Sequence, residues 1–191
     1  ARTSDTEWVL AFTTAGIATG SERITVVPAS TSSIYDGADN AAAATQSNNN
    51  LLLNEKVVPT ITSTTINGAN SELTVTFSEA VFTTTGGGPN PLQPGDFTLS
   101  MAGGVATIAS FDSVAKTSDT EWVLAFTTAG IATGSERITV VPASSSSIYD
   151  GANNAAAATQ SNNNLLLNDK ALPTITSTTI NGANSELTVT F

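Results

Sequence analysis

The sequence predicts an all-β protein in which two antiparallel sheets pack as a sandwich. Threonine supplies 32 of the 191 residues, and β-branched residues are favoured in strands. Apolar and polar residues alternate with period two in several short runs, as they do in half-buried strands. Glycine, asparagine and proline separate these runs at a spacing of roughly 8 to 15 residues, which is typical of sandwiches. A hydrophobic content of 40% is enough to form a core.

A hairpin is expected to open the best-defined unit. The β-branched run PTITSTTI leads through an Asn-Gly turn into an alternating strand over residues 72–82. Leu73, Val75 and Phe77 share one face of this second strand. The following segment, residues 83–96, consists largely of turn-forming residues and is predicted to be a long loop.

The remaining strands are predicted over residues 97–101, 105–111, 121–126, 137–141 and 159–167. Residues 155–158 and their copy at 41–44 are alanines, which leaves a helical turn or a small-residue approach to the last strand open. About seven short strands and no required amphipathic helix favour the sandwich.

A long internal repeat dominates the chain. Residues 3–77 and 117–191 align without a gap at an offset of 114 residues, and 70 of the 75 aligned positions are identical. The five differences are Thr31/Ser145, Asp39/Asn153, Glu55/Asp169, Val57/Ala171 and Val58/Leu172. Copies this similar indicate a tandem array of units of about 114 residues in which neighbouring units do the same work.

The boundary between units is expected in the runs LLLNEKVVPTIT and LLLNDKALPTIT, where a proline marks the start of a strand. This frame gives the C-terminal part of one unit (1–57), one complete unit (58–171) and the first two strands of the next (172–191). Both ends therefore fall inside a unit. We expect either a window on a longer polymer or a subunit completed by its neighbours.

Charge and composition exclude several classes of function. Six Lys and Arg residues against 16 Asp and Glu residues give a net charge of −10, so binding to nucleic acid or anionic lipid is not expected. No apolar run approaches the roughly 18 residues of a membrane span. The chain has no Cys and no His, which removes disulfides, the usual zinc ligand sets and His-based catalysis. With no convergent acid, base or nucleophile set visible, we do not expect an enzyme.

Two motifs carry a family resemblance. The run LTVTFSEAVF, residues 73–82, followed much later by ERITVVPASSSSIYDGANNAA, resembles the bacterial Ig-like domains found in tandem in S-layer proteins and giant surface adhesins. The resemblance covers residues 58–171 and recurs in both partial units, although the GGGPNP insertion and the DGADN and DGANN turns depart from the family pattern. It implies an Ig-like β-sandwich in an extracellular, cell-surface stalk or coat that is frequently stiffened by calcium at domain junctions.

Calcium is the one cofactor that the residues support, because a hard cation needs clustered carboxylate and carbonyl oxygens. Each unit offers them at a late turn and at the seam between units, where Glu79 or Asp96 of the next unit can meet the seam acid. The candidate ligands are Asp36, Asp39 and Asn40 with their copies Asp150, Asn153 and Asn154, and Asn54 and Glu55 with their copies Asn168 and Asp169. The alternative is that these Asp and Asn side chains only cap their own turns.

Other candidate sites have simpler interpretations. Trp8 and Trp122 alternate with Leu and Phe, which favours core anchors over a carbohydrate platform. Glu79 and Asp96 show no feature of a glycosidase pair. Gly-rich residues 86–88 lack the context of a phosphate-binding loop and are interpreted as a loop tip.

The sequence thus favours a structural repeat of an extracellular bacterial surface fibre, adhesin stalk or coat. It would act as a spacer or filament building block whose partners are neighbouring copies, arranged head to tail. One alternative is a self-assembling filament subunit completed by strand exchange between chains, although residues 1–57 and 172–191 together supply only 77 residues of a 114-residue unit. Another is a glycan- or partner-binding module that uses the 83–96 loop, with avidity from repetition.

Overall fold

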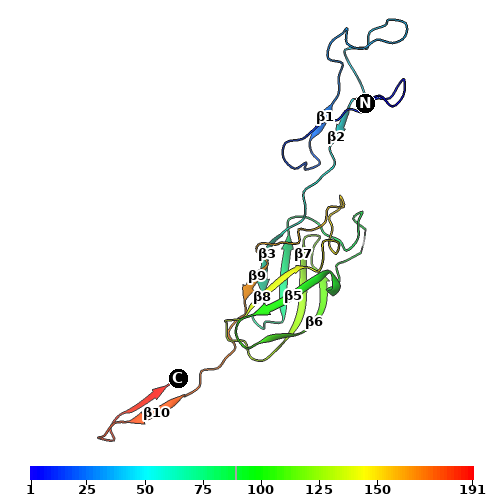
Figure 1. Ribbon diagram of the computed structural model, residues 1–191. Coiled ribbons are helices and arrows are strands. Elements are labelled where there is room, and N and C mark those ends of the chain that lie inside the picture. Colours follow the sequence, from blue (N-terminus) through cyan, green and yellow to red (C-terminus); the bar gives the residue numbers. More distant parts are fainter. Residues whose placement is uncertain (89) are drawn as a thin grey trace.

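A computed structural model describes residues 1–88 and 90–191 (Figure 1). A β-sandwich lies between an N-terminal segment and a C-terminal hairpin, and the chain enters it at one end and leaves at the other. The described residues contain eleven strands, one 3-10 turn and no α-helix, so the all-β prediction is confirmed. None of their helical segments is long and apolar enough to cross a membrane.

The first sheet of the sandwich has four antiparallel strands in the order β3-β4-β7-β6. They are β3 (Ile61–Ile66), β4 (Glu72–Phe77), β6 (Thr107–Lys116) and β7 (Glu121–Ala129). The predicted Asn-Gly turn joins β3 to β4, where the Asn67 side-chain oxygen accepts a hydrogen bond from the Ser71 backbone N–H at 2.9 Å. Strand β7 therefore lies between β4 and β6, with both of its edges paired.

The second sheet has three antiparallel strands in the order β5-β8-β9. They are β5 (Phe97–Ala102), β8 (Arg137–Pro142) and β9 (Asn164–Leu166), and the 3-10 turn η1 (Pro94–Asp96) leads into β5. The rings of Phe77 and Phe97 connect the two sheets, with their centroids 6.4 Å apart.

The core lies between the inward faces of the two sheets. Alternate residues of β4, β7 and β8 are buried, as the period-two pattern predicts. The inward side chains of these strands are Leu73, Val75, Phe77, Trp122, Leu124, Phe126, Ile138 and Val140. Burying a side chain of this size contributes about 1.5–3 kcal/mol, so these rows dominate the stability of the sandwich.

Two predicted strands are shorter than expected, and the choice left open at residues 155–158 is settled. The strand predicted over 72–82 ends at Phe77, because Phe82 leaves the sheet and forms a bridge with Tyr149. The strand predicted over 159–167 is only Asn164–Leu166, since Asn162 adopts a positive φ of 37° that interrupts the extended backbone. Residues 155–158 form no helix, and Ala155 instead bridges Tyr149.

The N-terminal segment repeats the pairing of the second sheet but keeps only one bridge of the first, between Arg2 and Trp8. Strand β1 (Arg23–Thr25) pairs with β2 (Asn50–Leu52) in the register that β8 and β9 use. Residues 7–15 have the same sequence as β7 but form no strand, since β4 and β6 have no counterpart within residues 1–57.

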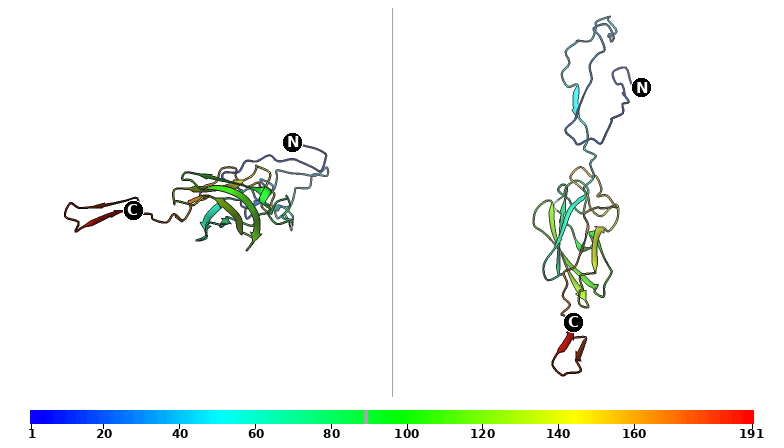
Figure 2. Two further views of the ribbon diagram at one scale, coloured as in Figure 1. Left: turned by 90° about the horizontal axis from the view of Figure 1, so that it is seen from below. Right: turned by 90° about the vertical axis from the view of Figure 1, so that its left-hand side faces the viewer.

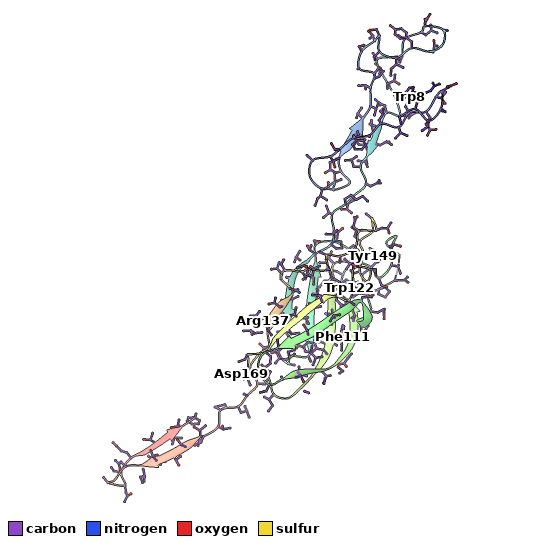
Figure 3. The ribbon with its side chains drawn as sticks, viewed as in Figure 1. Trp8, Phe111, Trp122, Arg137, Tyr149 and Asp169 are labelled. Carbon is purple, nitrogen blue, oxygen red and sulfur yellow. The ribbon has the colours of Figure 1, made fainter. Side chains whose placement is uncertain are left out.

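Burial of the two tryptophans follows this difference. Trp122 is 1% exposed inside the sandwich, whereas its copy Trp8 is 63% exposed (Figure 3). The prediction of a core anchor is thus confirmed for Trp122 and wrong for Trp8, which has no facing strand to cover it.

A hairpin of β10 (Ser177–Ile180) and β11 (Leu187–Thr190) forms the C-terminal end. Its sequence is that of β3 and β4, and it likewise leaves its apolar side chains in solvent. Leu187 and Phe191, for example, are 65% and 73% exposed.

A buried carboxylate closes one end of the sandwich. Oε1 of Glu136 accepts hydrogen bonds from the Val105 and Ala106 backbone N–H groups at 2.8 and 3.2 Å, and Oε2 accepts one from the Thr133 N–H at 2.9 Å. Burial by itself opposes ionisation, but these backbone donors outweigh it and lower the pKa of Glu136 to about 2. A Cβ at Gly104 would lie 2.0 Å from Oε1, so only glycine leaves room for the carboxylate.

The difference in burial predicts that Leu→Ala changes the free energy of unfolding by different amounts at two equivalent positions of the repeat. Leu124→Ala should destabilise the sandwich by about 2–5 kcal/mol, because it leaves a cavity in a fully buried row. Leu10→Ala in a dilute, monomeric chain should change stability by less than about 0.5 kcal/mol. Urea unfolding followed by circular dichroism measures both values. Equal losses would contradict the exposure of residues 7–15.

The Glu136 carboxylate predicts a specific acid sensitivity. Because its pKa is lower in the folded state, its contribution to stability is complete above pH 4.5 and is lost as the pH falls towards about 2. Glu136→Gln should lower the Tm by several degrees at pH 7. Between pH 4.5 and about 2, the Tm of this variant should depend less on pH than the Tm of the wild type. Glu22→Gln is the matched control, since the Glu22 carboxylate accepts hydrogen bonds from Thr19 but is exposed and lies outside the sandwich. A wild-type profile that is already flat would refute this role.

Candidate metal site at the junction of two units

The linker that enters the sandwich is held by hydrogen bonds on two sides. The Thr60 N–H donates to Ser78 Oγ at 3.0 Å, and the Ser78 N–H donates to the Thr60 carbonyl at 2.8 Å. On the other side, the Ala157 N–H donates to the Pro59 carbonyl at 3.3 Å. These contacts fix where residue 55, a few positions earlier, meets the end of the sandwich.

The backbone also brings two acids of the sandwich together. Phe82 and Tyr149 exchange two backbone hydrogen bonds of 2.8 Å, which sets the segment after β4 beside the turn that begins at Asp150. Asp150 is 1% exposed, and its Oδ1 accepts hydrogen bonds from the Ala152 and Asn154 N–H groups at 2.8 and 2.7 Å. The turn closes through Asn153, whose φ of 72° suits asparagine.

Three carboxylates meet at this point. Glu55 from the linker and Glu79 and Asp150 from the sandwich each have an oxygen within 4.8 Å of the others. Asn154 connects two of them, because its Nδ2 donates to Glu55 Oε2 at 2.5 Å and to Asp150 Oδ2 at 2.8 Å. Gly20 of the N-terminal segment lies on the outer side of Glu55, and a Cβ there would be 3.1 Å from the Glu55 Cβ.

The three carboxylates repel one another. The pKa of Glu79 is raised, mainly by burial and then by the charges of Asp150 and Glu55. A divalent cation would replace this repulsion with attraction, so the cluster can hold a metal ion. Its oxygen ligands suit a hard cation and not zinc, which prefers the His and Cys side chains that the chain lacks.

The predicted ligands divide between this cluster and other roles. Asp150, Asn154 and Glu55 lie together, and Glu79 is the loop acid that meets the seam. Asp96 is elsewhere, where its Oδ2 accepts a hydrogen bond from the Gln93 N–H at 2.7 Å. The Asn153 side-chain oxygen accepts a hydrogen bond from the Gly86 N–H.

In the N-terminal copy of the turn, the acid caps its own loop. Asp36 Oδ1 accepts from the Ala38 and Asn40 N–H groups at 2.8 and 2.9 Å, and Asn40 Nδ2 donates to Asp36 Oδ2 at 3.0 Å. The Asn40 side-chain bond is the main cause of the lowered pKa of Asp36. Asp39 takes the same left-handed backbone as Asn153, with a φ of 63°. This turn belongs to no cluster of acids in the described part of the chain.

The second copy of the seam lies at the exit end of the sandwich (Figure 3). Asn168 there bonds to the β3–β4 turn, with its N–H and Nδ2 both 2.9 Å from Asn70 Oδ1. Asp169 accepts a hydrogen bond from the Ala171 N–H at 2.8 Å. Asn54, the copy of Asn168, is exposed in the entry linker.

Two other features, a groove at the exit end and the 83–96 loop, do not resemble catalytic or ligand-binding sites in their described residues. A groove of about 510 Å³ at the exit end has Lys170 as the one titratable residue among the described residues that line it. The described part of the 83–96 loop is anchored, since Leu92 is fully buried and a Cβ at Gly87 would lie 3.3 Å from Gly151. Residue 89 of this loop lies outside the described residues.

Sequence reasoning missed the role of Glu136, and it named Glu79 only as one of two loop acids, with Asp96, that could meet the seam. The T-x-x-E spacing of Thr133 and Glu136, repeated at Thr19 and Glu22, is a local signal for a carboxylate that accepts backbone hydrogen bonds. Nothing in the sequence near Glu79 distinguishes it from Asp96 as the acid at the seam, because its partners lie 24 residues before it and 71 residues after it.

Comparisons of the chain with protein-family models, with curated proteins and with solved structures found no match.

The repulsion at the cluster predicts a pH effect in the presence of chelator. Since the folded state raises the pKa of Glu79, the ionised side chain opposes folding, and this cost appears as the pH rises through the raised pKa. Glu79→Gln should therefore raise the Tm at pH 7 in EDTA and have less effect near pH 4. Asp112→Asn, a carboxylate on β6 that bonds to Thr127, is the control. A lower Tm for Glu79→Gln in EDTA at pH 7 would contradict the repulsion.

Proposed function

We propose that the chain is a structural repeat of an extracellular bacterial surface fibre, adhesin stalk or coat, built from tandem Ig-like units. Each unit is a spacer of about 114 residues, and its partners are neighbouring copies joined head to tail. The work of such a repeat is to span distance and resist force, and the proposal assigns it no catalytic step.

The observation that carries this proposal is the path of the chain through the sandwich. The chain enters the sandwich at one end and leaves it at the opposite end (Figure 1). Successive units joined in this way extend along a line, because each exit becomes the next entry. The near-identity of the copies supports the same conclusion, since units in a spacer array all do the same work.

The acid cluster gives the array a means of stiffening. Glu55 belongs to the unit before the seam, whereas Glu79 and Asp150 belong to the unit after it. A cation bound by all three ties the linker to the next unit and restricts bending at the junction. Calcium is the ion of choice, because it accepts six to eight oxygen ligands in flexible geometry and binds extracellular modules with Kd values of about 10⁻⁴–10⁻³ M.

The chain itself contains a matched pair for a binding test. Glu55 completes the cluster at the entry linker, and its copy Asp169, at the exit linker, belongs to no cluster of three acids among the described residues. Glu55→Gln should weaken calcium binding by at least about tenfold in isothermal titration calorimetry, since it removes one of the three charged ligands. Asp169→Asn should leave the affinity unchanged. Equal effects of the two variants, or no heat of binding in the wild type, would refute the site.

Small-angle scattering tests whether the bound ion acts on the junction. Wild-type protein in millimolar calcium should give a narrower distribution of end-to-end distances than the same protein in EDTA, because a bound cation restricts the linker. Glu55→Gln should give the same distribution in both conditions. If the wild-type distribution is the same in calcium and in EDTA, a bound ion does not stiffen the junction, and the mechanical role is overturned.

A further inference from the structure

The first strand of the sandwich, β3, lies beside its last segment, residues 157–168, which contains β9. The Ile61 N–H donates a hydrogen bond to Gln160 Oε1 at 2.6 Å. Thr64 Oγ1 donates one to the Asn162 carbonyl at 2.9 Å. These bonds join residues that are 99 and 98 positions apart in the sequence. They therefore connect the beginning of the folded unit directly to its end.

A third contact continues this row at the exit end. Asn70, in the turn after β3, donates from Nδ2 to the Asn168 carbonyl at 2.8 Å. Its Oδ1 accepts hydrogen bonds from the N–H and the Nδ2 of Asn168, both at 2.9 Å. Asn70 is 3% exposed, so water has little access to these bonds. Hydrogen bonds in such surroundings are stronger than those in open solvent.

The order of the contacts shows that the two segments run in the same direction. Position 61 meets 160, position 64 meets 162 and position 70 meets 168, so both numbers rise together. β3 and β9 belong to different sheets. Two side-chain amides and one hydroxyl therefore connect them, in place of the backbone ladder that joins neighbours within a sheet.

Tension along the chain would pull these two segments in opposite directions. β3 follows the entry linker and β9 leads to the exit linker, and the right-hand view of Figure 2 shows the two linkers at opposite ends of the sandwich. Parallel neighbours that are pulled from opposite ends slide along each other, and all the bonds between them stretch together. Neighbours that are pulled from the same end separate one bond at a time, which needs a smaller force.

We propose that these three contacts form a strand clamp, which resists sliding of β3 past residues 157–168 when the sandwich is pulled through its two linkers. The contacts are spread from the entry end to the exit end, so sliding must break all of them. The clamp names the residues that bear the load. It rests on the proposed function for its biological use, since a stalk or fibre carries tension.

The clamp differs from the features that dominate equilibrium stability. The buried apolar rows contribute most of that stability, and a single hydrogen bond contributes a small part. Forced unfolding depends instead on the rate of crossing the unfolding barrier. That rate is sensitive to the contacts that break first. Substitutions in the clamp should therefore change the response to force more than they change the Tm.

Single-molecule force spectroscopy in EDTA tests the clamp. Handles at the two ends of the chain load the sandwich through residues 57 and 171. Its unfolding releases up to roughly 360–400 Å of chain, because about 110 residues lie between the linkers. Thr64→Val keeps a β-branched side chain but loses the bond to Asn162. It should raise the unfolding rate at a fixed force by about two- to tenfold. Thr65→Val, at an exposed position of the same strand, is the matched control and should leave the rate unchanged.

A second pair of variants separates resistance to force from stability. Asn70 has a φ of 59°, which glycine adopts freely, so Asn70→Gly removes the amide without straining the backbone. It should raise the unfolding rate at a fixed force at least tenfold. Leu124→Ala, on β7 and outside the clamp, should lower the Tm more but raise this rate less. Circular dichroism of each variant confirms that it is folded before it is pulled.

The direction of pulling gives a third measurement. The chain has no Cys, and a Cβ at Gly68 would lie in open space, so Gly68→Cys can carry a handle on the β3–β4 turn. This turn is at the exit end, where Asn168 Nδ2 donates to the Asn67 carbonyl at 3.0 Å. Pulling the handle at residue 68 against the C-terminal one loads the clamp from a single end. The sandwich should then open at a lower force than with handles at both ends of the chain.

Each result supports or overturns the clamp. Equal rates for Thr64→Val and Thr65→Val would overturn it, and so would equal forces in the two pulling directions. Unfolding rates that follow the Tm across Asn70→Gly and Leu124→Ala would overturn it as well. Because all of these measurements are made in EDTA, such results leave the calcium junction and the fibre proposal standing. A clamp that holds in a chain without calcium binding would be supported, whereas stiffening by calcium would be refuted.

Discussion

Pairing of β7 on both of its edges is the constraint on which the rest of the sandwich depends. β4 and β6 keep this strand extended by pairing with its two edges, and Trp122, Leu124 and Phe126 alternate along it into one core. They share this core with Ile138 and Val140 of β8, which belongs to the second sheet. The same nine residues at 7–15 form no strand where β4 and β6 are missing, which shows that the strand is a product of its partners.

The ends of the sandwich are organised by carboxylates in opposite electrostatic states. Glu136 is surrounded by backbone N–H donors, which stabilise its charge and lower its pKa. Glu79 faces two other acids and has its pKa raised. The first arrangement is self-sufficient and closes the fold. The second is incomplete without a counter-charge, and it sits where the linker of the preceding unit arrives. This contrast is why the junction, and not the interior, is the place to look for a ligand.

Repetition gives each surface a role that a single copy would not have. Glu55 belongs to one copy of the repeated sequence, and its carboxylate lies beside two acids of the next copy. An apolar strand that is exposed in a partial unit matches a strand covered in the whole one. The proposed stiffening of the junction depends on this order of identical copies, and it concerns the end of the sandwich that the preceding linker reaches.

The sequence by itself determined the all-β class, the repeat of 114 residues, the alternating core rows and the seam as the place for acids to gather. These are local or periodic properties that composition and spacing carry. It also pointed to Asp150 and Glu55, because acids at a turn and at a seam are visible in the chain.

The tertiary structure decided which copy of a repeated sequence forms a strand, and Trp8 and Trp122 therefore differ in burial. It also decided which acids lie beside Glu55. It also ended β4 at Phe77, because the bridge from Phe82 to Tyr149 draws the chain away. The physical reason is the same in each case. Hydrogen bonds across a sheet and contacts between carboxylates join residues far apart in the sequence, and no local pattern records which distant residues are present to receive them.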